Sequence, residues 1–553
     1  MAFGPFVIYP PVGYIDPWIY TGYFSNFAYL LSAGGLTYYV SRLPWILPGR
    51  LVFGIAGAQA GSLLLCAGTV TLGAVSLYWM VRWYYGVAPA ALAAIAWCTN
   101  PYVMAAAVWQ FPDGPAIAYA MAGLALYVRP AGNRGWNSFW AASLLVLSGT
   151  THMAAGPMLL STLVFPLWRC RHSVKELLKE AVCSGAGAGA AAFVLSRISR
   201  SLFGTPHFLQ PQIDQTLYVM HTPGYLADMW GTGPGFLLGA VHLFAPVFLL
   251  VFGLVLLIAI RKPAAVAWPA YLALWVCLAL YAVQEFVLHG AALRVPYSSS
   301  YMMVVTMAFA GFALGEVRTR CPGRGRAAVI SAGALALGAI ALSLAFSNRE
   351  IPFPDRGTWF RLALLGAVCT GLGVLTRRPK LPVHHLTCAF ILAILFLSPA
   401  LDWHATGHIW SGEKVAHGSN LISNRNAVAF RHVMEVENYV KSHVDTRRDL
   451  LFWWDADEPQ ARFFTSAAAL FECGHLDVDK GLRSGGRGLL ASYFPTSRTI
   501  VHLTVHPEQI AGRTRLMADH GILVANERRT TIEDAGQRFS LVMQDVIDNS
   551  RMH

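Results

Sequence analysis

Long apolar stretches alternate with short polar connections through the first 400 residues of the chain. A membrane-spanning helix needs about 20 mainly apolar residues, within a range of roughly 17 to 25. The pattern predicts twelve transmembrane helices, near 51–80, 87–107, 114–128, 136–150, 155–168, 181–200, 233–260, 264–286, 298–316, 327–346, 359–376 and 383–400. The third to fifth stretches are short, which is typical of broken or re-entrant helices that are buried in a bundle.

The pattern changes after residue 400, where most of the acidic residues stand. Apolar runs predict strands and amphipathic runs predict helices in this region. The strands are expected at 450–454, 499–505 and 521–524, and the helices at 427–442 and 507–520. We therefore expect a mainly α, polytopic membrane protein with a soluble C-terminal α/β domain. Its parts would be an external loop with an amphipathic helix (1–50), the multi-span domain (51–400) and the exported domain (401–553).

The composition agrees with a membrane protein. Apolar residue types make up 55% of the chain and charged types 13%, about half of the roughly 25% that is usual in globular proteins. The connections alternate in basic charge, with 16 Lys and Arg in one set and 6 in the other when the long C-terminal tail is left out. The positive-inside rule places the richer set in the cytoplasm. The first 50 residues, loop 201–232 and the C-terminal domain would then lie outside a cytoplasmic (inner) membrane, on its periplasmic side.

The net charge of +12 is explained by these cytoplasmic connections, so we expect no nucleic-acid partner. Nine cysteines are scattered along the chain without a CxxC pair, and most lie in or beside apolar segments. A disulfide framework or a zinc site is therefore not predicted.

Two acidic residues stand out because they are the only acids in the first 128 residues, and both are predicted at the outer face. Asp16 precedes a proline and Asp113 precedes a glycine. Each has a plain structural interpretation, Asp16 as a helix cap and Asp113 as a turn residue. Two isolated carboxylates at one membrane face could instead converge on one site, and we predict that they do.

Such a pair suits group transfer to a hydroxyl. One carboxylate can take the proton of the acceptor hydroxyl while a new bond forms, and the second can orient the acceptor or help to hold a divalent cation. No other cofactor is expected. A phosphate leaving group needs a cation, and the planar forks of Arg42 and Arg294 are candidates at the outer face. For Arg294, an interfacial arginine that only reaches toward water is equally open.

Aromatic and hydrogen-bonding side chains near these acids could hold a sugar, although the same mixture occurs at any membrane interface. The candidate substrate-binding residues are Tyr20, His152, His207 and Asp214. For His152, in a short outer turn, a neutral hydrogen-bonded histidine is the plainer interpretation.

The order of these motifs resembles the GT-C superfamily of integral-membrane glycosyltransferases, most of all the branch of the protein O-mannosyltransferases and the lipid A aminoarabinose transferase. The matching segments are Asp16–Tyr23, Tyr38–Pro44 and Phe111–Gly114. The resemblance implies that Asp16 is catalytic, that Asp113 is the second acid, and that a sugar leaves a polyprenyl-phosphate donor with inversion. A lipid, a glycan or a protein of the cell envelope would be the acceptor, and membrane lipids would surround the bundle.

One feature departs from that superfamily, whose members have a helix before the catalytic loop. Only fifteen residues precede Asp16 here. Even as a helix they would cover about 22 Å, less than the roughly 30 Å of the hydrocarbon core. Either the first helix of the family is missing from this version of the chain, or the start is unusual. Restoring one span would give thirteen.

Two other classes of function remain open at this stage. A transporter or flippase for a lipid or sugar would have paired charges near the bilayer midplane and two similar halves. A non-catalytic membrane scaffold that presents the C-terminal domain would have no cavity shared by Asp16 and Asp113. We favour the transferase because the charges cluster at the ends of the predicted helices.

Overall fold

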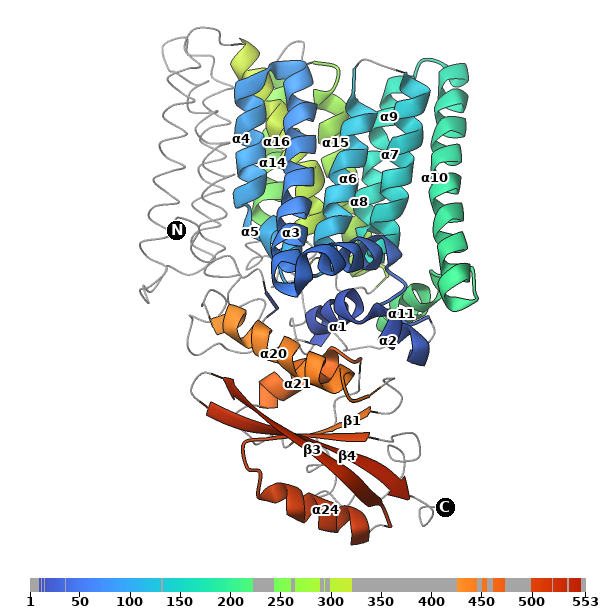
Figure 1. Ribbon diagram of the computed structural model, residues 1–553. Coiled ribbons are helices and arrows are strands. Elements are labelled where there is room, and N and C mark those ends of the chain that lie inside the picture. Colours follow the sequence, from blue (N-terminus) through green and yellow to red (C-terminus); the bar gives the residue numbers. More distant parts are fainter. Residues whose placement is uncertain are drawn as a thin grey trace, which may run out of the picture.

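The computed structural model shows a helical bundle with a small sheet-containing domain at one end (Figure 1). The residues described are 9–10, 12–13, 15–34, 36–130, 133–221, 243–259, 264–288, 293, 299–320, 425–444, 450–454, 461–472, 499–519, 521–534 and 537–548. The predicted fold class, a mainly helical multi-span membrane protein with a C-terminal sheet, is confirmed. The spans predicted at 327–346, 359–376 and 383–400 lie outside the described residues.

Helices occupy the described parts of every stretch predicted as a span between residues 51 and 316. They are α3 (Leu43–Tyr85), α4 (Val87–Thr99), α5 (Pro101–Ala107), α6 (Asp113–Val128), α7 (Arg134–Thr151), α8 (Gly156–Thr162), α9 (Val164–Cys170), α10 (Val174–Phe203), α14 (Phe244–Ala259), α15 (Ala267–Phe286) and α16 (Ser299–Arg320). Among the described residues, five segments are long and apolar enough to cross a membrane: Leu43–Tyr85, Met153–Cys170, Val174–Phe203, Ala267–Phe286 and Ser300–Thr319.

The broken helices differ in part from those predicted. The fifth stretch is interrupted, between α8 and α9, but the third and fourth form continuous helices, α6 and α7. The second stretch is broken instead, where Asn100 ends α4 and begins α5. Its side-chain oxygen accepts hydrogen bonds from the backbone N–H groups of Tyr102 (3.0 Å) and Val103 (3.2 Å), and Pro101 occupies the first turn. An N-cap followed by proline starts a new helix, which explains the break.

Packing within the bundle separates a buried centre from a lipid-facing rim. Residues 300–317 of α16 are all buried, whereas α10 lies at the edge with little of its length covered (Figure 1). Large apolar side chains on α10 are strongly exposed, including Val182 at 69% and Phe193 at 66%. In a chain of this composition such a surface is accounted for by contact with lipid tails.

Short helices lie across the end of the bundle that faces the sheet. These are α1 (Ile15–Ser25), α2 (Phe27–Gly34), α11 (Gln210–His221) and the first part of α3 (Figure 1). Helix α3 changes direction at Gly57, whose φ of 75° lies in the left-handed region that glycine adopts without a steric cost. The same helix therefore runs first along the end of the bundle and then into it.

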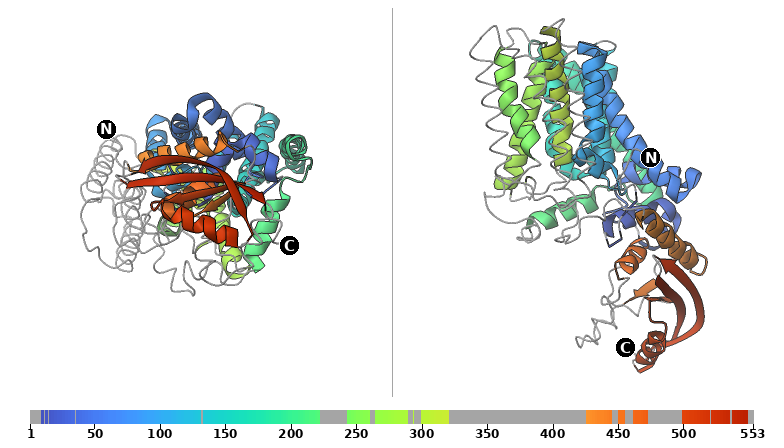
Figure 2. Two further views of the ribbon diagram at one scale, coloured as in Figure 1. Left: turned by 60° about the horizontal axis from the view of Figure 1, so that its bottom comes forward. Right: turned by 90° about the vertical axis from the view of Figure 1, so that its left-hand side faces the viewer.

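The C-terminal domain has three layers. Its sheet has the order β1-β2-β4-β3, in which β1 runs parallel to β2 and the other neighbours are antiparallel. The strands are β1 (Leu450–Trp453), β2 (Thr499–Thr504), β3 (Leu523–Asp534) and β4 (Gln537–Asp548). Helices α20 (Arg425–Lys441) and α21 (Ala461–Ala469) cover the face toward the bundle, and α24 (Gln509–Asp519) lies on the far side (Figure 2).

The predicted strands and helices of this domain are all present, although β3 is longer than expected and β4 was not predicted. The apolar face of α20 and α21 also packs against α1, so that one apolar core extends from the sheet to the end of the bundle. Trp18 of α1 stacks on Phe430 of α20 with ring centroids 5.6 Å apart. The domain is therefore joined to the membrane part by packing as well as by the chain.

Candidate active site

Asp113 is the first residue of α6 and is almost fully buried, with 4% of its surface exposed. The phenol of Tyr301, at the start of α16, donates a hydrogen bond to its Oδ1. Nε2 of His152 lies 4.0 Å from the same oxygen. The next residue, Gly114, lets α6 begin close to α5, because a Cβ there would lie 2.6 Å from the carbonyl oxygen of Ala106. Three separate segments thus meet at one carboxylate.

The chain that leads into Asp113 has an unusual backbone. Trp109 and Gln110 have φ angles of 65° and 60°, which non-glycine residues rarely adopt. The indole N–H of Trp45 donates a 2.9 Å hydrogen bond to the carbonyl oxygen of Gln110 and anchors this turn to the first part of α3. Strained backbone held by its surroundings is frequent at functional sites.

His152 is a hydrogen-bonded histidine, in keeping with the plainer interpretation of the sequence. Its Nδ1 accepts a 3.2 Å hydrogen bond from the backbone N–H of Ala154. In the neutral ring the proton then resides on Nε2, the nitrogen that faces Asp113. The ring also lies 5.9 Å from that of Tyr301, centroid to centroid. His152 is therefore arranged to hold a proton next to the buried carboxylate.

Asp16 differs from Asp113 in exposure. It lies in the first turn of α1, where the free N–H groups of a helix favour negative charge, and it is exposed to solvent. The phenol of Tyr39 donates a 2.9 Å hydrogen bond to its Oδ1. Burial, and then the nearby Asp16 carboxylate, raise the pKa of Tyr39, so that phenol remains a hydrogen-bond donor at neutral pH.

Arg42 acts on Asp113 and packs against two tyrosines of the same region. Its guanidinium carbon is 4.3 Å from the ring centroid of Tyr38 and 5.3 Å from that of Tyr20, and it donates a hydrogen bond to the Tyr38 hydroxyl. The charges of Arg42 and Asp16 both act on the Asp113 carboxylate. The sequence-predicted residues Asp16, Tyr20, Arg42, Asp113 and His152 are thus brought into one neighbourhood.

Tyr20 is buried completely in this neighbourhood. Its ring packs edge-on against Tyr39, with centroids 5.5 Å apart, and its hydroxyl has no hydrogen-bond partner among the described residues. A buried polar atom without a partner is costly and calls for an explanation. A substrate hydroxyl is one group that could satisfy it.

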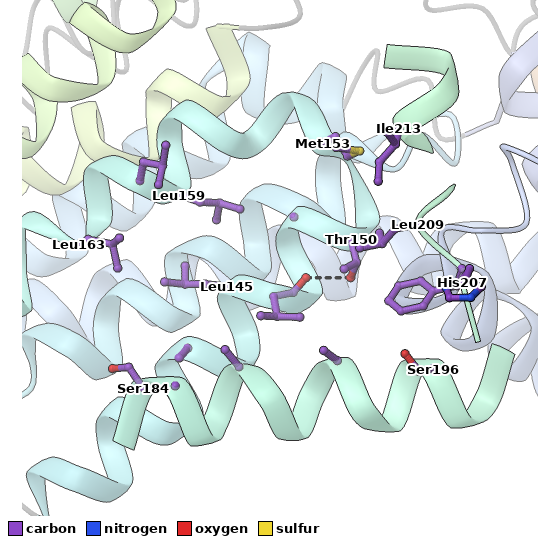
Figure 3. A pocket seen from close by; sticks show the side chains of 18 of the residues that line it. Leu145, Thr150, Met153, Leu159, Leu163, Ser184, Ser196, His207, Leu209 and Ile213 are labelled. Carbon is purple, nitrogen blue, oxygen red and sulfur yellow. Dashed lines mark hydrogen bonds between the residues drawn. The ribbon is translucent and has the colours of Figure 1, made fainter. Parts of the chain in front are cut away.

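The other predicted site residues are placed elsewhere. Asp214 is on the exposed side of α11 and accepts a 2.7 Å hydrogen bond from Gln210. His207 lines an apolar pocket of about 770 Å³ between α7, α8 and α10, shown in Figure 3. Thr150, which also lines that pocket, is two residues before His152, so the pocket begins next to the buried site. Arg294 lies outside the described residues.

A divalent cation was the one cofactor considered from the sequence. Within the ranges that the structure describes, no three His, Cys, Asp or Glu side chains gather in a way that could hold a metal ion. Asp113 and His152 are the two side chains of these types that the structure brings together in the described part of the site.

The sequence interpretation did not identify Tyr301 or Glu472. Tyr301 follows a Ser-rich segment at the start of an apolar span, five residues after Pro296, which is a weak signal for an interfacial tyrosine. Glu472 stands in the C-terminal domain, and no local pattern ties it to the membrane part. The phenol of Tyr23, on α1, donates a hydrogen bond to its Oε2.

Comparison with known proteins gives structural neighbours only. No protein-family model and no curated protein matches the sequence. The chain resembles ArnT from Cupriavidus metallidurans in the apo state, with a TM-score of 0.46 and 13% identity over 97% of this chain and 94% of that one. It also resembles the arabinofuranosyltransferase AftD from Mycobacteria (TM-score 0.48, 12% identity, 98% of this chain and 38% of that one).

A third neighbour is the oligosaccharyltransferase of Archaeoglobus fulgidus in the apo form, with a TM-score of 0.41 and 12% identity over 90% of this chain and 66% of that one. Two of these neighbours are named as glycosyl-transferring enzymes, an arabinofuranosyltransferase and an oligosaccharyltransferase. The similarity is one of general architecture, and the roles of individual residues rest on the geometry of this chain.

Proposed function

We propose that the chain is an inverting glycosyltransferase that moves a sugar from a polyprenyl-phosphate donor to an acceptor hydroxyl at the outer face of the cytoplasmic membrane. The observation that carries this proposal is that the buried Asp113 carboxylate is within electrostatic reach of both Arg42 and the exposed Asp16. The donor class comes from the resemblance of the motifs around Asp16 and Asp113.

In the proposed reaction, Asp16 accepts the proton of the acceptor hydroxyl, which it can reach because its carboxylate is exposed. The acceptor oxygen forms a bond to the anomeric carbon of the sugar as the bond from that carbon to the phosphate oxygen breaks. The phosphate leaves with the electron pair. Arg42 supplies positive potential for that phosphate from within the site, because its side chain is only 4% exposed.

Asp113 supports this arrangement from inside the bundle. Its carboxylate attracts the Arg42 guanidinium, and the Tyr301 phenol and the His152 ring restrict its orientation. A fixed set of charges needs little rearrangement as charge moves toward the phosphate, which is the usual source of electrostatic catalysis. The pocket beside His152 is apolar and could accept part of the hydrocarbon chain of a lipid substrate.

The full chain reconstituted in lipid vesicles allows a direct test. Polyprenyl-phosphate sugars would be supplied with an extract of envelope lipids, glycans and proteins, and release of polyprenyl phosphate would be measured. We expect Asp16→Asn to lower that release by about 10²–10⁴-fold, the usual contribution of a positioned base. The exposed Asp519 of α24, changed to Asn, is the matched control and should leave release unchanged. Transport of the donor without release would favour the transporter class instead.

A further inference from the structure

The C-terminal domain places a carboxylate, that of Glu472, next to the segment that holds Asp16. Glu472 follows α21 and is half-buried where the domain meets α1. The Tyr23 hydroxyl donates to Oε2 of Glu472, and the same hydroxyl lies 3.0 Å from Oγ1 of Thr37. Glu472 therefore connects α1 with the turn formed by residues 36–42.

That 36–42 turn is the segment that contacts Asp16. Tyr39, two residues after Thr37, donates the 2.9 Å hydrogen bond to Asp16. The carboxylates of Glu472 and Asp16 both act electrostatically on the Tyr39 phenol. A group of the C-terminal domain and the proposed catalytic base thus share one tyrosine.

The backbone around Glu472 is held closely in place. Its φ of 52° lies in the left-handed region, which a residue with a side chain occupies only when its surroundings fix it there. Two residues earlier, the carbonyl oxygen of Leu470 approaches Gly22 of α1 so closely that a Cβ at Gly22 would lie 2.0 Å from it. The junction therefore leaves little freedom in where the Glu472 carboxylate is presented.

We propose that Glu472 is a positioning residue for Asp16. Glu472 holds the 36–42 turn in place through Tyr23 and Thr37. Tyr39 of that turn then orients the Asp16 carboxylate through its hydrogen bond. This inference rests on the proposed function for the catalytic part of its effect. It makes the C-terminal domain a component of the active site, supplied across 449 residues of sequence.

The first test compares three variants in the transfer assay. Glu472→Ala should lower kcat by about 10- to 100-fold, the scale of one hydrogen bond to a charged group, and should leave the KM for the donor unchanged. Glu472→Gln keeps an oxygen for the Tyr23 hydroxyl, so most of kcat should return. Glu508→Gln alters an acid of the same domain that is 72% exposed and should have no effect. A change in KM alone would overturn the positioning role.

The second test asks whether Glu472 acts through Tyr39. In the background of Tyr39→Phe, the change Glu472→Ala should lower kcat no further, because residues that act as one unit do not have additive effects. If the double variant instead loses kcat by the product of the two single-variant losses, the proposal is overturned. Tyr23→Phe breaks the same connection from the α1 side and should give the loss seen with Glu472→Ala, which covers the case of a poorly folded Glu472 variant.

A third measurement does not depend on catalysis. Hydrogen exchange of the 36–42 turn should be faster in Glu472→Ala than in the unaltered chain or in Glu508→Gln. If exchange increases while Asp16→Asn transfers at the full rate, the proposed function is wrong and the structural connection stands. If neither exchange nor kcat changes in Glu472→Ala while Asp16→Asn is inactive, the positioning role is wrong and the proposed function stands.

Discussion

The two halves of the candidate site are constructed in different ways. The bundle half consists of Asp113, His152 and Tyr301, which lie on helices or helix ends of the membrane part, and both Asp113 and Tyr301 are buried. The domain half consists of Asp16, Tyr39 and Glu472, of which Asp16 is exposed and Glu472 is half-buried. Helix packing alone can fix the first half, whereas the second is complete only when the C-terminal domain docks.

This difference separates two requirements of a transferase. A buried, fixed charge network favours stabilisation of the leaving phosphate, because charges act more strongly where water is excluded. An exposed carboxylate can meet acceptors that arrive from water. Arg42 joins the halves, since its charge acts on Asp113 while its guanidinium lies over Tyr20 and Tyr38.

After the loss expected for Asp16→Asn, the largest effect is expected in the bundle half. Asp113→Asn preserves the shape of the side chain but removes its charge, so we expect kcat to fall about 10³-fold, within the range for a group of a catalytic network. Tyr301→Phe should lower kcat about 10-fold, because it removes one hydrogen bond to the Asp113 carboxylate. Steady-state transfer measures both. Full activity of Asp113→Asn would remove the bundle half from the mechanism.

The next effect should appear when the domain half is displaced. Gly22→Val places side-chain atoms where the Leu470 carbonyl lies, so α21 must move away from α1. We expect kcat to fall about 10- to 100-fold, as for loss of the Glu472 contact, and hydrogen exchange in α1 to increase. The control is Gly512→Ala in α24, where an added Cβ meets open space. Equal behaviour of the two variants would contradict the docking account.

The sequence was informative wherever a local pattern was enough. Apolar length predicted the described spans, apolar runs predicted three strands, and the scarcity of charge singled out Asp16 and Asp113. It could not show that Glu472 reaches α1, because that contact joins residues 449 positions apart through tertiary packing. Nor could it show that Asp214 turns away from the bundle, which depends on the direction of α11 after Gly204.

A third prediction concerns the pH dependence of docking. Glu437 of α20 is buried against α1 and accepts hydrogen bonds from Ser25 and Asn26. Burial raises the pKa of Glu437 to about 7, from an ordinary 4.5. The protonated Glu437 therefore contributes about 3 kcal/mol to the free energy of unfolding below about pH 4.5. This contribution is lost as the pH rises through about 7.

Glu437→Gln, which cannot ionise, tests this directly. The unfolding temperature would be measured from pH 5 to 8 in roughly unit steps. As the pH rises, the unfolding temperature of the unaltered chain should fall relative to that of the variant. Parallel unfolding temperatures across that range would show that Glu437 is not protonated in the docked state.

The smallest effect is expected at Thr37. Thr37→Val removes the hydroxyl that lies 3.0 Å from that of Tyr23 while keeping the shape of the side chain. Because this contact connects Tyr23 and Glu472 to the 36–42 turn, we expect kcat to fall about 10-fold, the lower end of the loss expected for Glu472→Ala. Full activity of Thr37→Val would show that Glu472 does not act through this turn.

The central claim is that the two carboxylates serve one reaction. A double-mutant cycle on the transfer rate, with Asp16→Asn, Asp113→Asn and both together, tests it most directly. The double variant should be at most about threefold slower than the slower of the two single variants, because the effects of residues that act as a unit are not additive. Losses that multiply in full, or undiminished transfer by either single variant, would contradict the claim.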